Sequence, residues 1–488
     1  MEENNGSKSI KTLHAYCFLK TENKWFSFFF YRRAILQNED LLATSPLTNL
    51  LTNDFWGTPL SHSGSHKSYR PLCSLTFKLN TIWSGLNPYG FHLVNIILHC
   101  IATYLFTQLA KSQFSKSKSK AAIIISSLAF ALHPIHTEAV AGIVGRADIL
   151  AGIFFLSALL TFDQYQKSMK IKNEGTRPFL IWTVFFATLA MFCKESGITV
   201  LGVCLVSLLA RKPSKSAILS LVLAIMGLLV LRGQIMGFQP PKFAKADNPV
   251  SASKSVISRF LTLLYLPVFN FWLMLCPNEL SFDWSMDAIP LINGLGDPRN
   301  GLSAVFYGAW MVLSWKQRKV RKEGWHKKAF RLLLWWLAGE LSWRSMEQWL
   351  IIVLCLILLS FGQILGTLAT LANWLIFRFQ NSTIRISLAV MFCSFLPATN
   401  LLFYVGFVVA ERILYIPSIG FCLLLGHVLT KKATKNRLGR MAIFALLAIW
   451  ACRTVVRNQD WKDEESLYRA GVPINPAKGK IINWSVTK

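Results

Sequence analysis

The sequence predicts an all-α fold, a polytopic bundle of membrane helices. Hydrophobic residues make up 53% of the 488 positions and charged residues only 16%, whereas a soluble domain carries about 25% charged residues. Apolar stretches of about 14 to 20 residues recur along most of the chain, and the longer ones suit a bilayer-crossing helix. Lys and Arg gather in short segments between these stretches, as in cytosolic loops of membrane proteins.

Twelve apolar stretches are expected to cross the membrane, with the count open by about two because several are short. In chain order they are 91–109, 121–132, 149–162, 178–192, 197–210, 217–231, 301–315, 329–343, 350–375, 384–397, 413–429 and 441–457.

The net charge of +28 is explained by the loops between these stretches. The basic residues gather in four segments: 111–120, 211–215, 316–328 and 431–437. No basic surface is interleaved with stacking aromatic residues, so no nucleic-acid partner is expected. Ten cysteines show no paired spacing such as C-x-x-C, which argues against a disulfide framework or a metal site.

Placing the basic loops in the cytosol fixes the side of every other loop. The polar segments His133–Asp148, Cys193–Ser196, Arg232–Asn300 and Pro397–Arg412 then all fall on the opposite face. For this count to hold, the apolar stretch 259–277, with a proline in its middle, is expected to lie in the interface or to re-enter. A transporter would be expected to gather its polar groups near the bilayer midplane instead.

Three domains follow from this count. Residues 1–90 form an atypical N-terminal segment, and residues 91–457 form the multi-span membrane core with a luminal lobe at 232–300. Residues 458–488 form a luminal tail.

The predicted span 91–109 carries three polar residues on one helical face. His92, Asn95 and His99 are spaced i, i+3 and i+7. Polar groups are unfavourable toward lipid, so this face should look into the bundle. Two interpretations stay open: hydrogen bonds that join helices, and a functional cavity.

The segment HPIHTEAVAGIVGRAD carries five polar or titratable residues between two apolar runs: His133, His136, Glu138, Arg146 and Asp148. In the simpler interpretation the segment is a turn with an Arg–Glu pair, and Asp148 caps the next helix. In the functional interpretation, a basic and imidazole-rich cluster beside the bilayer binds a lipid-linked phosphate.

Two more charged pairs fall on the same predicted face. They are Lys194 with Glu195 and Glu411 with Arg412. Sequence alone does not decide whether they approach the first segment. The chain has no G-x-x-x-x-G-K-[ST], H-E-x-x-H or G-x-S-x-G motif, which argues against an ATPase, a metalloprotease and a serine hydrolase.

Seven long motifs resemble the TMTC family of transmembrane and tetratricopeptide-repeat O-mannosyltransferases, in the family order. They are NDFWGTPLSHSGSHKSYRPL (Asn53–Leu72), NPYGFHLVNIILH (Asn87–His99), HPIHTEAVAGIVGRAD, CKESGITVL (Cys193–Leu201), LSFDWSMDAIP (Leu280–Pro290), FLPATNLLFYVGFVVAERILYIPS (Phe395–Ser418) and DWKDEESLYRAGVPINPAK (Asp460–Lys478).

The resemblance implies a GT-C glycosyltransferase fold in the endoplasmic-reticulum membrane. It implies dolichyl-phosphate-mannose as the lipid-linked donor, no separate cofactor, and Ser or Thr hydroxyls of secretory proteins such as cadherins as acceptors. The implied reaction is an inverting displacement at the sugar C1. A luminal carboxylate takes the hydroxyl proton, and basic residues stabilise the leaving phosphate.

The sequence departs from the family pattern in two regions. Phe30 and Tyr31 stand where the family has an acidic pair after its first span, and no span is evident in Met1–Lys24. At the other end, no 34-residue repeat follows the lead-in motif. These departures predict a transferase core that is inactive as written. Two alternatives stay open: a non-catalytic adaptor that contacts a calcium pump of the endoplasmic reticulum, and a transporter.

Overall fold

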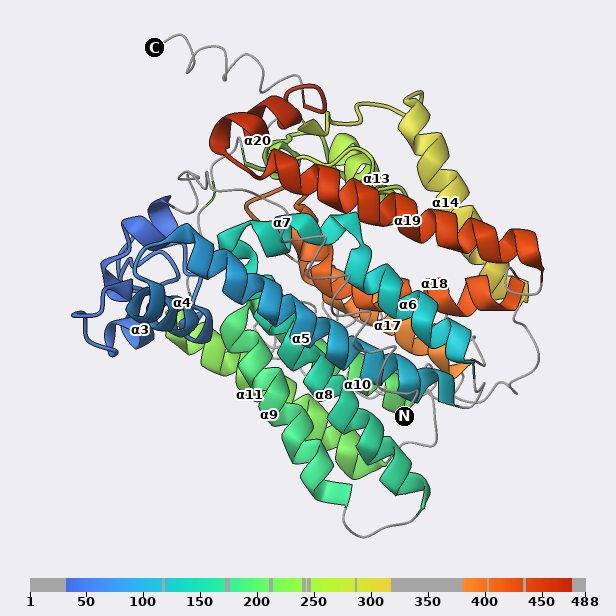
Figure 1. Cartoon of the computed structure of the whole chain (residues 1–488), viewed down its shortest axis with the longest axis horizontal. Coiled ribbons are helices and arrows are strands. Elements are labelled where there is room, and N and C mark those ends of the chain that lie inside the picture. The colour runs from blue at the N-terminus through green and yellow to red at the C-terminus, as the bar shows by residue number, and fades with distance from the viewer. Residues whose placement is uncertain are drawn as a thin grey trace, which may run out of the picture. The chain divides into compact units, whose positions relative to one another are not determined.

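The computed structural model describes residues 32–115, 119–171, 176–209, 214–238, 243, 247–285, 288–316, 381–401, 403–432 and 436–475. Figure 1 draws these segments as helices joined by loops. Within the described ranges no β-strand forms, and a single bridge joins Asn53 to Pro59. The all-α prediction is therefore confirmed.

The α-helices have the following bounds: α3 Asn49–Thr52, α4 Pro71–Ser84, α5 Pro88–Phe114, α6 Lys120–Leu132, α7 Thr137–Ala141, α8 Arg146–Lys170, α9 Arg177–Cys193, α10 Thr199–Leu209, α11 Lys215–Ile235, α12 Pro249–Ala252, α13 Val256–Leu275, α14 Pro298–Lys316, α17 Ser382–Phe395, α18 Tyr415–Lys432, α19 Arg437–Asp460 and α20 Glu464–Gly471.

Six helical segments among the described residues are long and apolar enough to cross a membrane: Pro88–Phe114, Ile143–Met169, Lys215–Ile235, Val256–Leu275, Glu411–Lys431 and Arg437–Asp460. A seventh candidate is the pair Lys120–Leu132 and Pro134–Ala141, which is bent by 41°. Shorter apolar helices lie at Arg177–Cys193, Glu195–Leu209 and Ser382–Ala398. These properties are those of a multi-pass membrane protein.

The span that contains α8 is the most buried of the six candidate spans. It packs against α5, α9 and α18, and Figure 1 shows α5, α8 and α9 running alongside one another. In the apolar stretch of this span 72% of the residues are buried, whereas the corresponding share is 17% for α11 and 22% for α19. Because the described residues leave most of the apolar surface of α11 and α19 uncovered, these two helices are suited to facing lipid.

Glycines let α18 approach its neighbours closely. A Cβ at Gly420 would lie 2.2 Å from the carbonyl oxygen of Ser387 on α17. A Cβ at Gly426 would lie 2.9 Å from the carbonyl oxygen of Ala122 on α6. Small residues at such contacts are the usual means of close helix packing in membranes.

Most of the described helices overlap the predicted spans, and several run further. Helix α5 starts three residues before 91 and extends to Phe114, and α8 continues to Lys170. The basic ends of these helices were expected to be loop, but the backbone hydrogen bonds continue there. The predicted spans 329–343 and 350–375 lie outside the described residues.

Residues 259–277 form most of α13, a continuous helix with Pro267 inside it. By length and composition α13 can cross a bilayer, so the expected interfacial or re-entrant placement finds no support in its shape. The predicted lobe 232–300 is also less distinct than expected, because it begins within α11 and ends within α14.

The chain forms two compact units. One comprises residues 1–303 and 382–488, and the other comprises residues 304–381. In the second unit the structure describes only Ala304–Lys316 of α14 and residue 381. Every residue of the candidate site belongs to the first unit.

Candidate functional site

The segment between α6 and α8 is a series of short helical turns rather than an open loop. A 3-10 turn at Pro134–His136 leads into α7, and a second at Ile143–Gly145 leads into α8. The Nδ1 atom of His133 accepts from the amide of Ile135 at 3.2 Å and so starts the first turn. A Cβ at Gly145 would lie 2.4 Å from the carbonyl oxygen of Ala139, so the second turn needs a glycine.

Ion pairs join this segment to two others that are distant in sequence, and one of those is paired in turn with two more. Asp148 binds Lys194 at 2.5 Å, and Glu138 binds Arg412 at 3.2 Å. Glu195 binds two arginines, Arg70 at 3.0 Å and Arg232 at 2.8 Å. We call these seven residues the charge cluster: Arg70, Glu138, Asp148, Lys194, Glu195, Arg232 and Arg412.

The charge cluster lies where helices begin or end. Arg70 directly precedes α4, Asp148 is in the first turn of α8, and Lys194 lies between α9 and the turn before α10. Arg232 is in the last turn of α11, and Arg412 is in the 3-10 turn before α18. With Glu138 in the first turn of α7, charged groups from six elements therefore meet at the ends of the helices.

One edge of the charge cluster is open to solvent. The side chain of Asp148 is 3% exposed, whereas that of Glu195 is 37% exposed and that of Arg412 is 30% exposed. Four cations face three carboxylates, so the cluster has a formal charge of +1. A cluster that is basic overall and has a partly exposed edge is suited to binding an anion.

The cations of the cluster influence one another. Burial lowers the pKa of Lys194, Asp148 opposes that shift, and Arg70 and Arg412 lower it further. For Arg70, burial opposes the charged form, but Glu195 outweighs it and raises the pKa. The separate ion pairs thus lie within electrostatic reach of each other.

Several pairings expected from the sequence are wrong. Lys194 binds Asp148 rather than its neighbour Glu195, and Arg412 binds Glu138 rather than Glu411. Asp148 does not cap α8, because the helix begins two residues earlier and its carboxylate is held by Lys194. Residues adjacent in sequence here point to different partners across the bundle.

Arg146 is also not paired with Glu138. It is fully buried, and its guanidinium donates to Asn95 Oδ1 at 2.7 Å and Asn80 Oδ1 at 2.8 Å. It also donates to the carbonyl oxygens of Thr76 and Phe91. We call this the Arg146 pocket. Its contacts are those of a structural arginine, and its expected role at the phosphate stays a prediction.

The four candidate histidines are all buried. His99 Nδ1 lies 2.6 Å from the hydroxyl of Tyr415, and His136 Nε2 lies 2.7 Å from the hydroxyl of Ser418. His133 Nε2 lies 2.9 Å from the carbonyl oxygen of Met274. These contacts tie α5 and the turn after α6 to α13 and α18.

The predicted inward face of α5 is confirmed, because His92, Asn95 and His99 are all buried. Asn95 donates to the carbonyl oxygen of Val140 at 3.2 Å and accepts from Arg146. Of the two open interpretations, the contacts of Asn95 and His99 match hydrogen bonding between helices.

Glu411 joins the loop before α14 to the cluster. Its Oε1 accepts from the amide of Ser281 at 2.6 Å and from Trp284 Nε1 at 3.1 Å. The next residue, Arg412, belongs to the charge cluster. On its other side this loop contacts α20, because the rings of Phe282 and Tyr468 meet edge to face at 4.9 Å.

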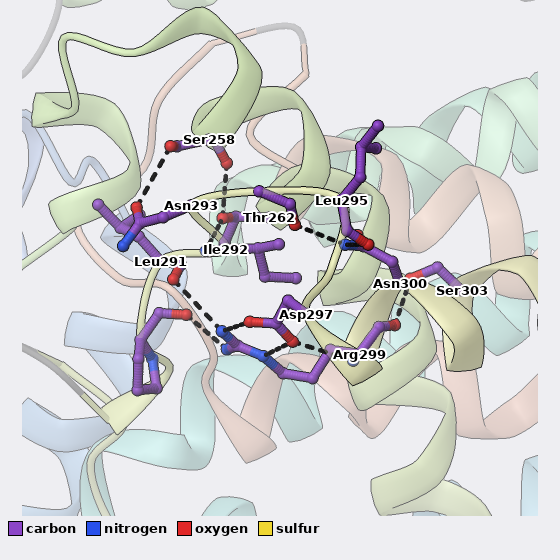
Figure 2. Close-up of polar contacts among 12 residues, drawn as sticks. Ser258, Thr262, Leu291, Ile292, Asn293, Leu295, Asp297, Arg299, Asn300 and Ser303 are labelled. Carbon is purple, nitrogen blue, oxygen red and sulfur yellow. Dashed lines mark hydrogen bonds and ion pairs between the residues drawn. The ribbon is translucent and has the colours of Figure 1, made fainter.

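The residues from Pro290 to the start of α14 are organised around Arg299, as Figure 2 shows. The guanidinium of Arg299 binds the Asp297 carboxylate at 2.6 Å and donates to the carbonyl oxygens of Pro290 and Leu291. Hydrogen bonds from Arg299 lower the pKa of Asp297 to about 2. Thr262 on α13 accepts from the amide of Ile292 at 2.9 Å, so the loop is fixed to that helix.

Sequence analysis missed Arg70 and Arg232 as site residues. Both residues lie in regions that the sequence singles out, because Arg70 is part of the first long motif and Arg232 directly follows the predicted span 217–231. A basic residue at the far-side end of a span is unusual, because such residues prefer the cytosolic side. That signal could have identified Arg232. Phe30 and Tyr31 lie outside the described residues.

The fold and the cluster define a class: a multi-pass helical membrane protein with a partly exposed ionic cluster at its helix ends. Residues 237–311 match the family described as "Protein O-mannosyl-transferase TMTC, DUF1736". The chain belongs to the TMTC family.

Curated relatives match nearly the whole chain. Protein O-mannosyl-transferase tmtc2 of Xenopus laevis is 40% identical over 91% of this chain and 56% of its own length. The mouse TMTC2 protein gives the same figures, and Tmtc1 of Drosophila melanogaster is 39% identical over 92% of this chain and 55% of its own length. The motifs look most like the family's second member, and the first two relatives carry that name. The chain spans about half the length of these relatives, and no solved structure matches it.

Proposed function

We propose that this chain is the membrane core of a protein O-mannosyltransferase of the endoplasmic reticulum. The donor would be dolichyl-phosphate-mannose, and the acceptors would be Ser or Thr hydroxyls of secretory proteins such as cadherins. The names of the relatives support the reaction class. The observation that supports it in this chain is the basic edge of the cluster, where Arg70 and Arg232 bind the partly exposed carboxylate of Glu195 and Arg412, bound to Glu138, is 30% exposed.

The basic edge would bind the phosphate of the donor. Arg70 and Arg232 converge on one carboxylate, so an incoming phosphate oxygen can bind both guanidinium groups beside it. In the reaction, the acceptor oxygen forms a bond to the mannose C1 and the bond from C1 to the phosphate oxygen breaks. Dolichyl phosphate leaves with the bonding electrons, and the cations stabilise its developing charge.

The reaction also needs a base to take the proton of the acceptor hydroxyl. Glu138, Asp148 and Glu195 each bind a cation, and Glu411 accepts from an amide and an indole. The family's acidic pair falls at Phe30 and Tyr31. We therefore propose that this chain binds the donor and transfers mannose poorly.

The test separates binding from transfer. The chain is reconstituted in nanodiscs, and binding of dolichyl phosphate is measured for wild type, Arg70→Gln and Arg232→Gln, with Arg299→Gln as the matched control outside the cluster. Each cluster variant should bind about 10-fold more weakly, in line with the loss of one charge-assisted contact. The control should bind as wild type. Equal binding by all four forms would refute the donor site.

Transfer is measured on a cadherin domain with dolichyl-phosphate-mannose as donor. The double variant Phe30→Asp, Tyr31→Asp should transfer at least 100-fold faster than wild type, within the range of about 10²–10⁴ expected for a general base. If wild type already transfers as fast as the double variant, the proposed role of the acidic pair is wrong.

A non-catalytic adaptor is the second candidate, and Phe30 and Tyr31 in place of acids favour it. On this proposal the membrane core contacts a calcium pump of the endoplasmic reticulum and changes calcium handling. Stoichiometric co-purification with the pump, together with absence of dolichyl phosphate binding, would favour the adaptor over the transferase.

A further inference from the structure

One face of α4 is apolar and uncovered by the described residues. Leu79, Ile82 and Trp83 are 56%, 58% and 66% exposed. Leu86 and Tyr89 continue the same exposed surface into the start of α5. The spacing i, i+3 and i+4 places the first three on one side of the helix, and the other two follow the end of α4 at Ser84. We call these five residues the α4 stripe.

On both sides of the stripe, α4 is held in the protein by buried polar residues. Lys78 is buried and donates to the carbonyl oxygens of Asp40 at 3.0 Å, Leu42 at 2.7 Å and Ser45 at 2.8 Å. Asn80, also buried, accepts from Arg146 in the Arg146 pocket. These contacts fix the rotation of α4, so the exposure of its stripe is built into the fold.

The polypeptide passes from α4 directly into a candidate membrane span. Gly85 has a φ of 62°, a left-handed conformation that allows a sharp bend between α4 and α5. Helix α5 begins at Pro88, three residues after that bend begins. The surface of α5 continues with exposed Ile97 and Ile101, which suit lipid contact. Exposed apolar residues therefore lie on both sides of the bend, on α4 and on the candidate span α5.

The chemistry of the stripe identifies its occupant. Trp83 and Tyr89 flank the bend, and these two residue types are enriched where the hydrocarbon meets the headgroups. A short helix with one apolar and one polar face typically lies about 5–10 Å into that boundary. We propose that α4 lies in the membrane interface, with the α4 stripe inserted among lipid headgroups and the upper acyl chains.

This placement sets the depth of the charge cluster. Arg70 directly precedes α4, so an interfacial α4 holds its guanidinium close to the level of the lipid phosphates. For the donor this consequence rests on the proposed function. The membrane contact of α4 does not depend on it, because it needs neither donor nor acceptor.

The experiment locates single probes relative to the bilayer. A fluorescent amino acid is incorporated by codon suppression at Leu79, Ile82 or Trp83, one site per variant, in the full chain reconstituted into vesicles. A probe at Ile101 on α5 serves as the deep control, and a probe at the exposed loop residue His62 serves as the aqueous control. Phosphatidylcholine brominated near the headgroup or near the chain end, and iodide in the buffer, act as quenchers.

The three stripe probes should be quenched more strongly by the shallow bromines than by the deep ones, and less by iodide than the His62 probe. The Ile101 probe should show the reverse preference between bromines. Quenching of the stripe by iodide alone would place α4 in water. Quenching by neither reagent would mean that protein, such as residues 1–31 or a second copy, covers the stripe. Either result overturns the proposal, and three independent sites guard against one misfolded variant.

Discussion

Two regions of the molecule use arginine in opposite ways. In the Arg146 pocket, a fully buried guanidinium is surrounded by neutral amide and carbonyl oxygens from α4 and α5. At the charge cluster, Arg70 and Arg232 share the partly exposed carboxylate of Glu195. A guanidinium enclosed by neutral acceptors cannot exchange partners without leaving polar atoms unpaired. An ion pair at an exposed edge can accept a new anion.

The largest expected effect is loss of the Arg146 pocket. Arg146→Met removes the donor to the buried amide oxygens of Asn80 and Asn95, each of which is unfavourable by about 1–3 kcal/mol when unpaired, and it also removes two hydrogen bonds to helix carbonyls. We expect a large drop in the thermal midpoint in detergent and poor recovery of folded protein. Arg469→Met is the control, because Arg469 is exposed and pairs only with Glu465 one turn away. Normal stability with lost donor binding would assign Arg146 to the phosphate site instead.

The next effect is a change at the exposed edge. Glu195→Gln frees Arg70 and Arg232 from their carboxylate. Stability should fall, because two neighbouring cations then lose their counter-ion. Binding of dolichyl phosphate should tighten by roughly 10-fold at low ionic strength, and the gain should shrink as salt screens the charges. Weaker binding in Glu195→Gln would show that the carboxylate holds the arginines in place for the ligand.

A smaller effect concerns pH and Lys194. Burial lowers its folded pKa below the usual 10.5, so between the two values the unfolded chain binds more protons. Stability from this group should therefore rise with pH through the window just below 10.5. The measurement compares the thermal midpoint with pH for wild type and Lys194→Met. If the difference between the two curves is flat there, the burial of the Lys194 ammonium is less than the structure indicates.

The smallest effect belongs to the local pair of Asp297 and Arg299, which are two residues apart. The folded pKa of Asp297 is lowered to about 2 from 3.8. The contribution of this carboxylate to the stability of the fold is present above pH 3.8 and is lost as the pH falls toward 2. Asp297→Asn should change the thermal midpoint at neutral pH only slightly, since local surface pairs contribute little. A fall in the thermal midpoint as large as that of Glu195→Gln would show that this local ion pair stabilises the fold as much as the long-range pairs do.

Much of the secondary structure could be predicted, whereas the pairing of the charges could not. The inward face of α5 followed from the 3.6-residue period, because polar groups avoid lipid. The partner of Glu138 could not follow in the same way, since Arg412 lies 274 residues away. Adjacent residues such as Lys194 and Glu195 looked like pairs only because sequence shows proximity along the chain.

The sequence by itself determined the helices, the clustering of basic loops and the polar character of the segments that carry the charge cluster. Those features depend on hydrophobic spacing and local backbone preference, which act over a few residues. Only the tertiary structure decided that amide and carbonyl oxygens enclose Arg146 and that one face of α4 is left apolar and exposed. It also decided that Glu195 lies between Arg70 and Arg232, although Arg70 and Glu195 are 125 residues apart in the sequence. Those outcomes depend on which helix ends meet, and packing of the whole bundle sets that.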